Sequence, residues 1–114
     1  MIADTNVIID RHKSGEDIPE NISIVSSTEF PPILESEFFE GEIYTLTSED
    51  QVLAIKLQKK LRDRGDPVPA PDLLIAAAAI NRDEKVVTND EDFKKIRSVA
   101  RPAIERDKGS SANT

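Results

Sequence analysis

The chain contains no cysteine among its 114 residues, which excludes disulfide bonds and thiolate metal sites. It has a single histidine, so a zinc site built on imidazole ligands is disfavoured. No apolar stretch approaches the roughly 20 residues that a membrane-spanning helix needs, so no membrane association is expected. No signal peptide precedes the first apolar segment, and the expected location is therefore the cytoplasm.

Positive charge is also scarce, because 15 Lys and Arg face 22 Asp and Glu, which gives a net charge of −7. Broad, non-specific binding to nucleic acid normally needs a basic surface. A nucleic-acid enzyme is still allowed, because divalent cations bound to carboxylates reverse the local sign of the charge. The length fits one domain with its own core.

Short apolar, β-branched segments alternate with segments of helical periodicity along the chain. Strands are expected at residues 2–3, 22–26, 43–46, 85–88 and 99–100, and helices at residues 5–9, 29–39, 48–64, 72–80 and 89–96. This order predicts an α/β fold, a three-layer α/β/α sandwich around a central, mostly parallel sheet of four to five strands. Residues 1–104 are expected to form the domain, and residues 105–114 a polar, frayed tail.

The segment 48–64 has the clearest helical pattern. Ser48 to Gln51 matches a capping box, and Leu53, Leu57 and Leu61 recur at helical spacing. This apolar stripe is interpreted as core or dimer interface. The basic residues between Lys56 and Arg64 could hold RNA phosphates, but a solvated helix face is the favoured interpretation.

Four acids lie where a strand or an extended segment is expected to pass into a helix, namely Asp4, Glu29, Asp72 and Asp90. Helix capping and the helix dipole explain any one of them alone. The carboxyl ends of strands in an open α/β sheet face one crevice, so the four together indicate a shared site. Crowded carboxylates raise each other's pKa values, and Mg²⁺ or Mn²⁺ would relieve that repulsion.

Four stretches extend this pattern over most of the chain: IADTNVIID at 2–10, SSTEF at 26–30, PDLLIAAA at 71–78 and VTNDEDF at 87–93. In this order they resemble PIN-domain ribonucleases and, within them, the VapC-like toxins of toxin–antitoxin pairs. The resemblance implies a PIN-like nuclease domain at 1–104 with Mg²⁺- or Mn²⁺-dependent endoribonuclease activity. It also implies an RNA substrate, a cognate antitoxin protein as partner and a homodimer.

The resemblance also assigns roles to single residues. By position, the catalytic and metal-binding acids of the family correspond to Asp4, Glu29, Asp72 and Asp90. Thr88 resembles the hydroxyl that supports the site, and Asn6 the polar residue that fixes the first turn. Composition does not separate Asp90 from Asp92. The family spacing after Thr88 favours Asp90, and Asp92 stays an additional ligand, either direct or through water.

Two departures from the family pattern affect Glu29. Only 24 residues separate it from Asp4, so the first connection is expected to be shortened. Pro31 and Pro32 follow closely, which predicts a change in how the Glu29 side chain points.

Two other interpretations of the sequence compete with the nuclease. A non-catalytic PIN-like module that binds a partner protein or RNA is the alternative, and the complete acid set argues against it. A phosphatase of the haloacid-dehalogenase type is disfavoured, because position 6 is Asn where that chemistry wants Asp. His12, Asp10 and Glu91 are expected to face water.

Overall fold

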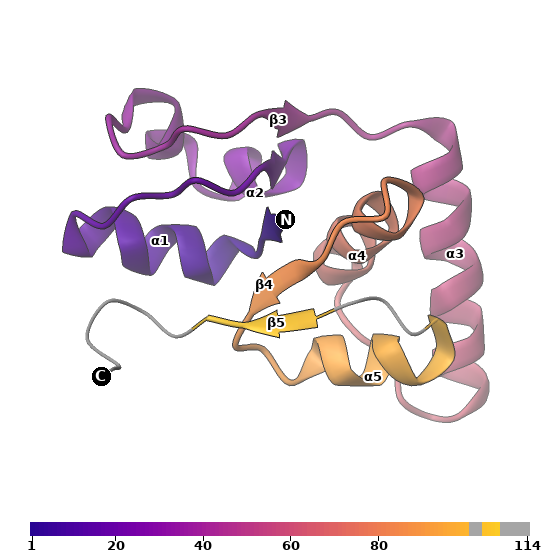
Figure 1. Ribbon diagram of the computed structural model, residues 1–114. Helices are drawn as coiled ribbons and strands as arrows, with labels where there is room; N and C mark the ends of the chain where they lie inside the picture. Colours follow the sequence, from indigo (N-terminus) through magenta and orange to yellow (C-terminus); the bar gives the residue numbers. More distant parts are fainter. Residues whose placement is uncertain (101–103, 108–114) are drawn as a thin grey trace.

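The computed structural model describes residues 1–100 and 104–107 (Figure 1). Their elements follow the chain as β1 (Ile2–Ala3), α1 (Thr5–Ser14), β2 (Ile22–Ser23), α2 (Ile24–Glu29), the 3₁₀ helix η1 (Pro31–Glu35), β3 (Ile43–Tyr44), α3 (Ser48–Asp63), α4 (Ala70–Asn81), β4 (Val86–Thr88), α5 (Asp92–Ala100) and β5 (Ile104–Arg106). In the same residues, no helix combines the length and the apolar character that crossing a bilayer requires.

The strands form one parallel arrangement. β1, β4 and β5 lie side by side in the order β1-β4-β5, and β2 pairs with β3. Asn21, directly before β2, joins the two groups, because its N–H donates to Met1 O and its carbonyl accepts from Ala3 N, each over 2.9 Å. The full order is therefore β3-β2-β1-β4-β5, with all carboxyl ends at one edge, as the sequence predicts.

Helices cover both faces of this sheet, which gives the three expected layers (Figure 1). Neighbouring residues of a strand point to opposite faces. Ile2 and Val86 accordingly belong to a buried cluster with side chains of α3, α4 and α5. Ala3 and Val87 belong to a second cluster with Val7 and Ile8 of α1. β1 and β4 are thus apolar on both faces, as is expected of the buried centre of a parallel sheet.

Three boundaries differ from those expected. Ser23 ends β2 early, because its hydroxyl accepts from Val25 N–H and caps α2. The helix expected at 29–39 is wrong, since α2 already ends at Glu29 and the two prolines start η1 instead. The strand expected at 99–100 is also wrong, because these residues complete the last turn of α5 and the edge strand is β5.

Helix starts shift by one or two residues. The capping box of α3 uses Thr47 and Asp50, which exchange two hydrogen bonds of 3.0 Å, instead of Ser48 and Gln51. α4 begins at Ala70, so Asp72 lies inside its first turn. At the other end of the chain, β5 continues past the expected domain boundary at residue 104. The rest of the expected tail, 108–114, lies outside the described residues.

The expectation of a solvated His12 is wrong. Its side chain is half-buried, with Nδ1 3.1 Å from Ser36 Oγ. Its ring meets those of Phe30 and Phe38 edge-on, with centroids 5.4 and 6.5 Å away. His12 therefore helps to pack η1 and the following loop against α1. Asp10 and Glu91 are exposed, as expected.

Candidate metal centre

Asp4 occupies the turn from β1 into α1, with only 3% of its surface exposed. Its backbone N–H donates to Val87 O over 2.9 Å, which ties the turn to β4. Asp4 Oδ1 accepts the Thr5 N–H over 2.7 Å and caps α1. Its other oxygen, Oδ2, accepts the Thr88 hydroxyl over 3.0 Å. The residue is therefore both a helix cap and a carboxylate held in one orientation.

The turn after β4 carries the second part of the site. Thr88 is the last residue of β4, and its hydroxyl accepts the Asp90 N–H over 2.9 Å while donating to Asp4. Asp90 Oδ1 in turn accepts the Asp92 N–H over 2.9 Å, at the first residue of α5. These bonds orient Asp90 inward over the end of the sheet and start the helix beyond it.

Asp72, in the first turn of α4, lies across the edge of the sheet from the turn that carries Asp90. One carboxylate oxygen from each of Asp72, Asp90 and Asp92 lies within 4.8 Å of the other two. Mg²⁺ holds oxygen ligands at about 2.0–2.1 Å, so two opposite ligands are about 4 Å apart. Three hard oxygen donors at this separation fit one such ion after small side-chain movements.

Electrostatic interactions connect Asp72, Asp90 and Asp92 with two further acids, Asp4 and Glu29. The pKa of Asp72 is raised to about 7 by burial, and by the negative charges of Asp4, Asp90, Asp92 and Glu29. Burial also raises the pKa of Asp4, although the hydrogen bonds from Thr88 and Thr5 oppose this, and Asp90 and Glu29 raise it further. A divalent cation would stabilise the ionised form of every one of these groups.

Glu29 reaches the same region from the last residue of α2. Thr5 Oγ1 donates to Glu29 Oε1 over 2.6 Å and lies 2.9 Å from Ser26 Oγ. Because the Thr5 hydroxyl has one proton, Ser26 must be the donor in the second bond. The prediction that Glu29 lies where a strand passes into a helix is therefore wrong. Glu29 projects from the end of a helix and is exposed.

The comparisons with known proteins identify the family of this chain. Residues 26–99 match the family model of the PIN domain, which includes every candidate acid except Asp4. The chain belongs to the PIN domain family. None of the curated proteins matches its sequence.

Solved structures share this PIN fold at low sequence identity. A chain of DNA-bound VapBC from Salmonella typhimurium matches with a TM-score of 0.76 and 21% identity, over 92% of this chain and 96% of that chain. VapBC2 from Rickettsia felis, bound to a promoter DNA fragment, matches with a TM-score of 0.72 and 20% identity over the same shares. VapBC-5 from Mycobacterium tuberculosis, a member of the VapBC family of toxin–antitoxin systems, gives 0.67 and 20%, over 92% of this chain and 94% of that chain.

The sequence prediction assigns no role to two supporting residues of this PIN domain, Thr5 and Ser26. The Thr5 hydroxyl holds Glu29. The prediction places Ser26 in a strand, whereas it precedes Glu29 by three residues of a helix, a spacing that would have indicated a shared helix face.

Asp4 caps the first turn of α1. Asn6, which the resemblance gives as the residue that fixes this turn, has an exposed side chain. Asn6 lines a cavity of about 160 Å³ beside the acid cluster, together with Val7, Asp10, Asn89 and Asp90.

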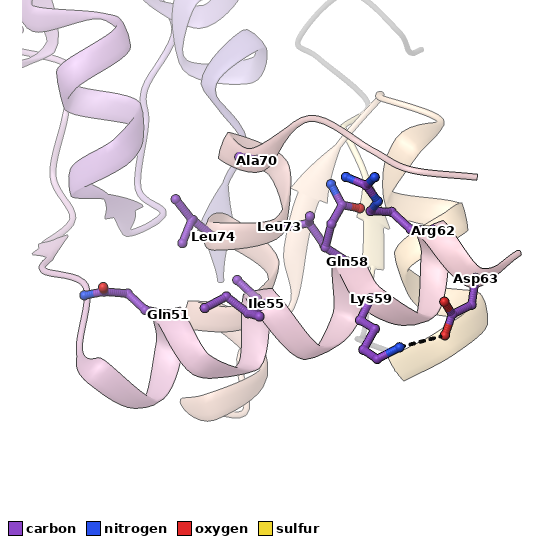
Figure 2. Close-up of a pocket in the computed structure, with 10 residues that line it drawn as sticks. Gln51, Ile55, Gln58, Lys59, Arg62, Asp63, Ala70, Leu73 and Leu74 are labelled. Atoms are coloured by element: carbon purple, nitrogen blue, oxygen red, sulfur yellow. Dashed lines mark hydrogen bonds and ion pairs between the residues drawn. The ribbon is translucent and has the colours of Figure 1, made fainter. Parts of the chain in front are cut away.

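A larger cavity of about 630 Å³ lies elsewhere on the PIN domain, between α3 and α4 (Figure 2). Its walls include Ile55, Leu73 and Leu74, with Lys59 and Arg62 at the rim. None of the candidate acids is among its described lining residues. It is an apolar groove of the helical layer and separate from the acid cluster.

Proposed function

We propose that this PIN-domain protein is a metal-dependent endoribonuclease that hydrolyses phosphodiester bonds of RNA with Mg²⁺ or Mn²⁺. The observation that carries the proposal is the cluster of Asp72, Asp90 and Asp92, whose oxygens lie within 4.8 Å of one another. The pKa of about 7 at Asp72 supports it, because such a group needs a cation to be fully ionised at neutral pH.

A bound Mg²⁺ or Mn²⁺ would supply the Lewis acidity that activates water and stabilises charge on the phosphate and the leaving oxygen. Asp72, Asp90 and Asp92 would hold it, and Asp4 would complete the site from the buried side. Thr88 fixes Asp4 and Asp90 relative to each other, since its hydroxyl is hydrogen-bonded to both residues. Glu29 has an exposed carboxylate at the rim, positioned by Thr5, and would accept the proton of the attacking water.

The products follow from where water attacks. Water adds to phosphorus in line with the 3′-oxygen, that oxygen leaves with a proton, and the products carry a 5′-phosphate and a 3′-hydroxyl. The RNA ends therefore report on the mechanism, because attack by the ribose 2′-hydroxyl would give a cyclic phosphate instead.

We further infer that the protein acts as the toxin of a toxin–antitoxin pair, with a cognate antitoxin as partner, and that it forms a homodimer. The VapBC structures that share its fold support the pairing with an antitoxin, whereas the homodimer rests on the sequence resemblance alone. Induced expression of the wild type is expected to stop growth, and Asp4→Asn to relieve it. An encoded neighbour that restores growth and co-purifies with the chain would be the antitoxin. A monomeric mass by light scattering would contradict the homodimer.

Cleavage of single-stranded and structured RNA tests the nuclease directly. The wild type is expected to cut with Mg²⁺ or Mn²⁺ and to stop with EDTA, whereas Asp4→Asn and Asp72→Asn lose at least about 100-fold in rate. Asp63→Asn, which removes an exposed acid of α3, is the matched control and should cut normally. Equal cleavage by the wild type and both site variants would refute the assignment.

A further inference from the structure

One face of α5 leads away from the acid cluster. Asp92, Lys95 and Ser98 follow each other at three-residue spacing, so each is a neighbour of the next on the surface of the helix. Lys95 Nζ lies 3.8 Å from Asp92 Oδ1, one of the three clustered acids. Beyond it, Ser98 Oγ accepts a hydrogen bond of 2.7 Å from Arg64 Nη1 and donates one of 2.6 Å to Lys95 O. An acid, a lysine and an arginine thus follow each other along one surface, here called the α5 track (Asp92, Lys95, Ser98 and Arg64).

The basic residues of α3, together with Arg64 after it, lie at three different parts of the surface. Lys59 pairs with Asp63 over 3.3 Å and lies with Arg62 at the rim of the α3–α4 groove (Figure 2). Lys56 borders another cavity near the start of α3. Arg64, directly after the end of α3, turns toward α5. Within the basic cluster noted in the sequence, Arg64 therefore joins the surface that leads to the acids.

An RNA strand entering the acid cluster needs positive charge close by. The chain has a net charge of −7, and the clustered acids repel phosphates until cations neutralise them. Lys95 is 41% exposed, and its second ion pair, with Asp66 Oδ1 over 3.6 Å, joins two partly exposed groups. Such pairs contribute little, so a phosphate can replace Asp66 at low cost. Within the part of the chain that the structure describes, the Arg64 guanidinium donates to Ser98 Oγ, and its five donors allow it to bind a phosphate as well.

We propose that Lys95 and Arg64 bind two successive backbone phosphates of the RNA, next to the bond that is cut. The proposal rests on the proposed function, because it names where the substrate of the same site lies. Lys95 provides a mobile point charge at the edge of the acids. Arg64 provides a fixed fork one turn further along α5. Asp66 holds Lys95 in place while the site is empty.

Two measurements test the track. The first is binding of a fluorescein-labelled single-stranded RNA with Ca²⁺ in place of Mn²⁺, so that the acids are neutralised by a hard cation, followed by anisotropy from about 50 to about 200 mM KCl. The second is steady-state cleavage with Mn²⁺. Lys95→Gln and Arg64→Gln should each raise Kd and KM about 3- to 10-fold, leave kcat near the wild-type value, and reduce the salt slope by about 0.7. Lys56→Gln is the matched control and should do none of these.

Further variants distinguish a direct contact of Arg64 and Lys95 with RNA from a structural role of these residues. Arg64→Lys keeps the charge but not the fork, and should retain the salt slope. Asp66→Asn frees Lys95 and should lower Kd about 2- to 3-fold, an effect that disappears in the Lys95→Gln background. An equal gain from Asp66→Asn in both backgrounds would assign it to general charge and overturn the role of Lys95.

Failure of the track and failure of the nuclease are distinguishable. If the wild type cuts RNA but Lys95→Gln and Arg64→Gln match Lys56→Gln in Kd, KM and salt slope, the track is wrong and the nuclease stands. If the wild type does not cut RNA but the variants show these same losses in binding, Lys95 and Arg64 still bind RNA phosphates and the nuclease is wrong. If the wild type does not bind RNA, the track is wrong.

Discussion

Thr88 Oγ1 donates a hydrogen bond of 3.0 Å to Asp4 Oδ2, although the two residues are 84 positions apart in the chain. The bond closes over paired strands, since Ala3 lies opposite Val87. The same hydroxyl accepts the Asp90 N–H over 2.9 Å. One buried side chain therefore sets the relative position of two candidate ligands, one from each end of the chain.

Thr88→Val removes both bonds while keeping the shape of the side chain. Asp4 would lose its hydroxyl donor and the Asp90 N–H its acceptor, so both acids can turn away from the site. The rate of RNA cleavage is expected to fall about 10- to 100-fold, which is the usual effect of losing a group that orients metal ligands. Thr88→Ser keeps the hydroxyl and should stay within a few-fold of the wild type in the same cleavage assay. A fully active Thr88→Val would remove Thr88 from the site.

The raised pKa of Asp72 predicts how stability depends on pH without metal. The pKa is about 7 in the folded protein against an ordinary value of 3.8. Between these values the folded protein binds more protons than the unfolded chain, so the free energy of unfolding falls as pH rises through this window and levels off above it. Asp72→Asn removes this dependence and should be more stable than the wild type at about pH 8, with no difference below about pH 4.

Urea unfolding in EDTA, at several pH values, measures this effect. Asp63→Asn is the control and should follow the wild type. Saturating Mn²⁺ should reverse the order, because it stabilises the wild-type acid cluster more than the variant. A wild type and an Asp72→Asn variant with the same pH profile in EDTA would show that Asp72 titrates normally.

The sheet and the acids could be predicted because their signals are local. Apolar pairs such as Ile2-Ala3 and Val86-Val87 mark strands buried on both faces. Asp4 directly follows the first pair, and Asp90 comes two residues after the end of β4. Asp72 is predictable for the same reason, since it lies in the first turn of α4, only three positions after the N-cap residue Pro69.

The features that differ from the prediction depend on side-chain contacts that cannot be chosen from the sequence alone. Ser23 can continue a strand or cap a helix, and its hydroxyl bond to Val25 N–H decides for the helix. That choice moves Glu29 from the start of a helix to the end of one, where Thr5 holds it. His12 likewise follows charged neighbours in the sequence, but Phe30 and Phe38 enclose its ring from distant positions.

A buried ion pair away from the acids is expected to stabilise the fold without serving the site. The Asp50 side chain is fully buried, and Arg82 Nη1 lies 3.1 Å from its Oδ2. Burial alone would raise the pKa of Asp50, but hydrogen bonds from Thr47, Asn81 and Arg82 lower it. The group therefore stabilises the fold at neutral pH, and this contribution is lost as pH falls through its lowered pKa.

Arg82→Met should lower the free energy of unfolding by about 2–3 kcal/mol, because it leaves the Asp50 charge buried with fewer partners. It also removes the guanidinium that lies 4.8 Å from the centre of the Tyr44 ring. Urea unfolding measures the loss, and Arg62→Met on the exposed side of α3 should change little. The Mn²⁺ affinity of Arg82→Met should equal that of the wild type. A weaker affinity would mean that the pair acts on the site.

Mn²⁺ titration by calorimetry distinguishes the roles of Asp90 and Asp92, which sequence spacing alone does not separate. Both lie within 4.8 Å of Asp72 through one oxygen each, so Asp90→Asn and Asp92→Asn should each weaken Mn²⁺ binding at least about 10-fold. Glu91→Gln is the matched control, because this acid lies between them in sequence but pairs with Lys94 over 3.0 Å and is exposed. If Asp92→Asn binds Mn²⁺ as tightly as Glu91→Gln does, the ion is held by Asp72 and Asp90 with Asp4, and Asp92 serves only to start α5.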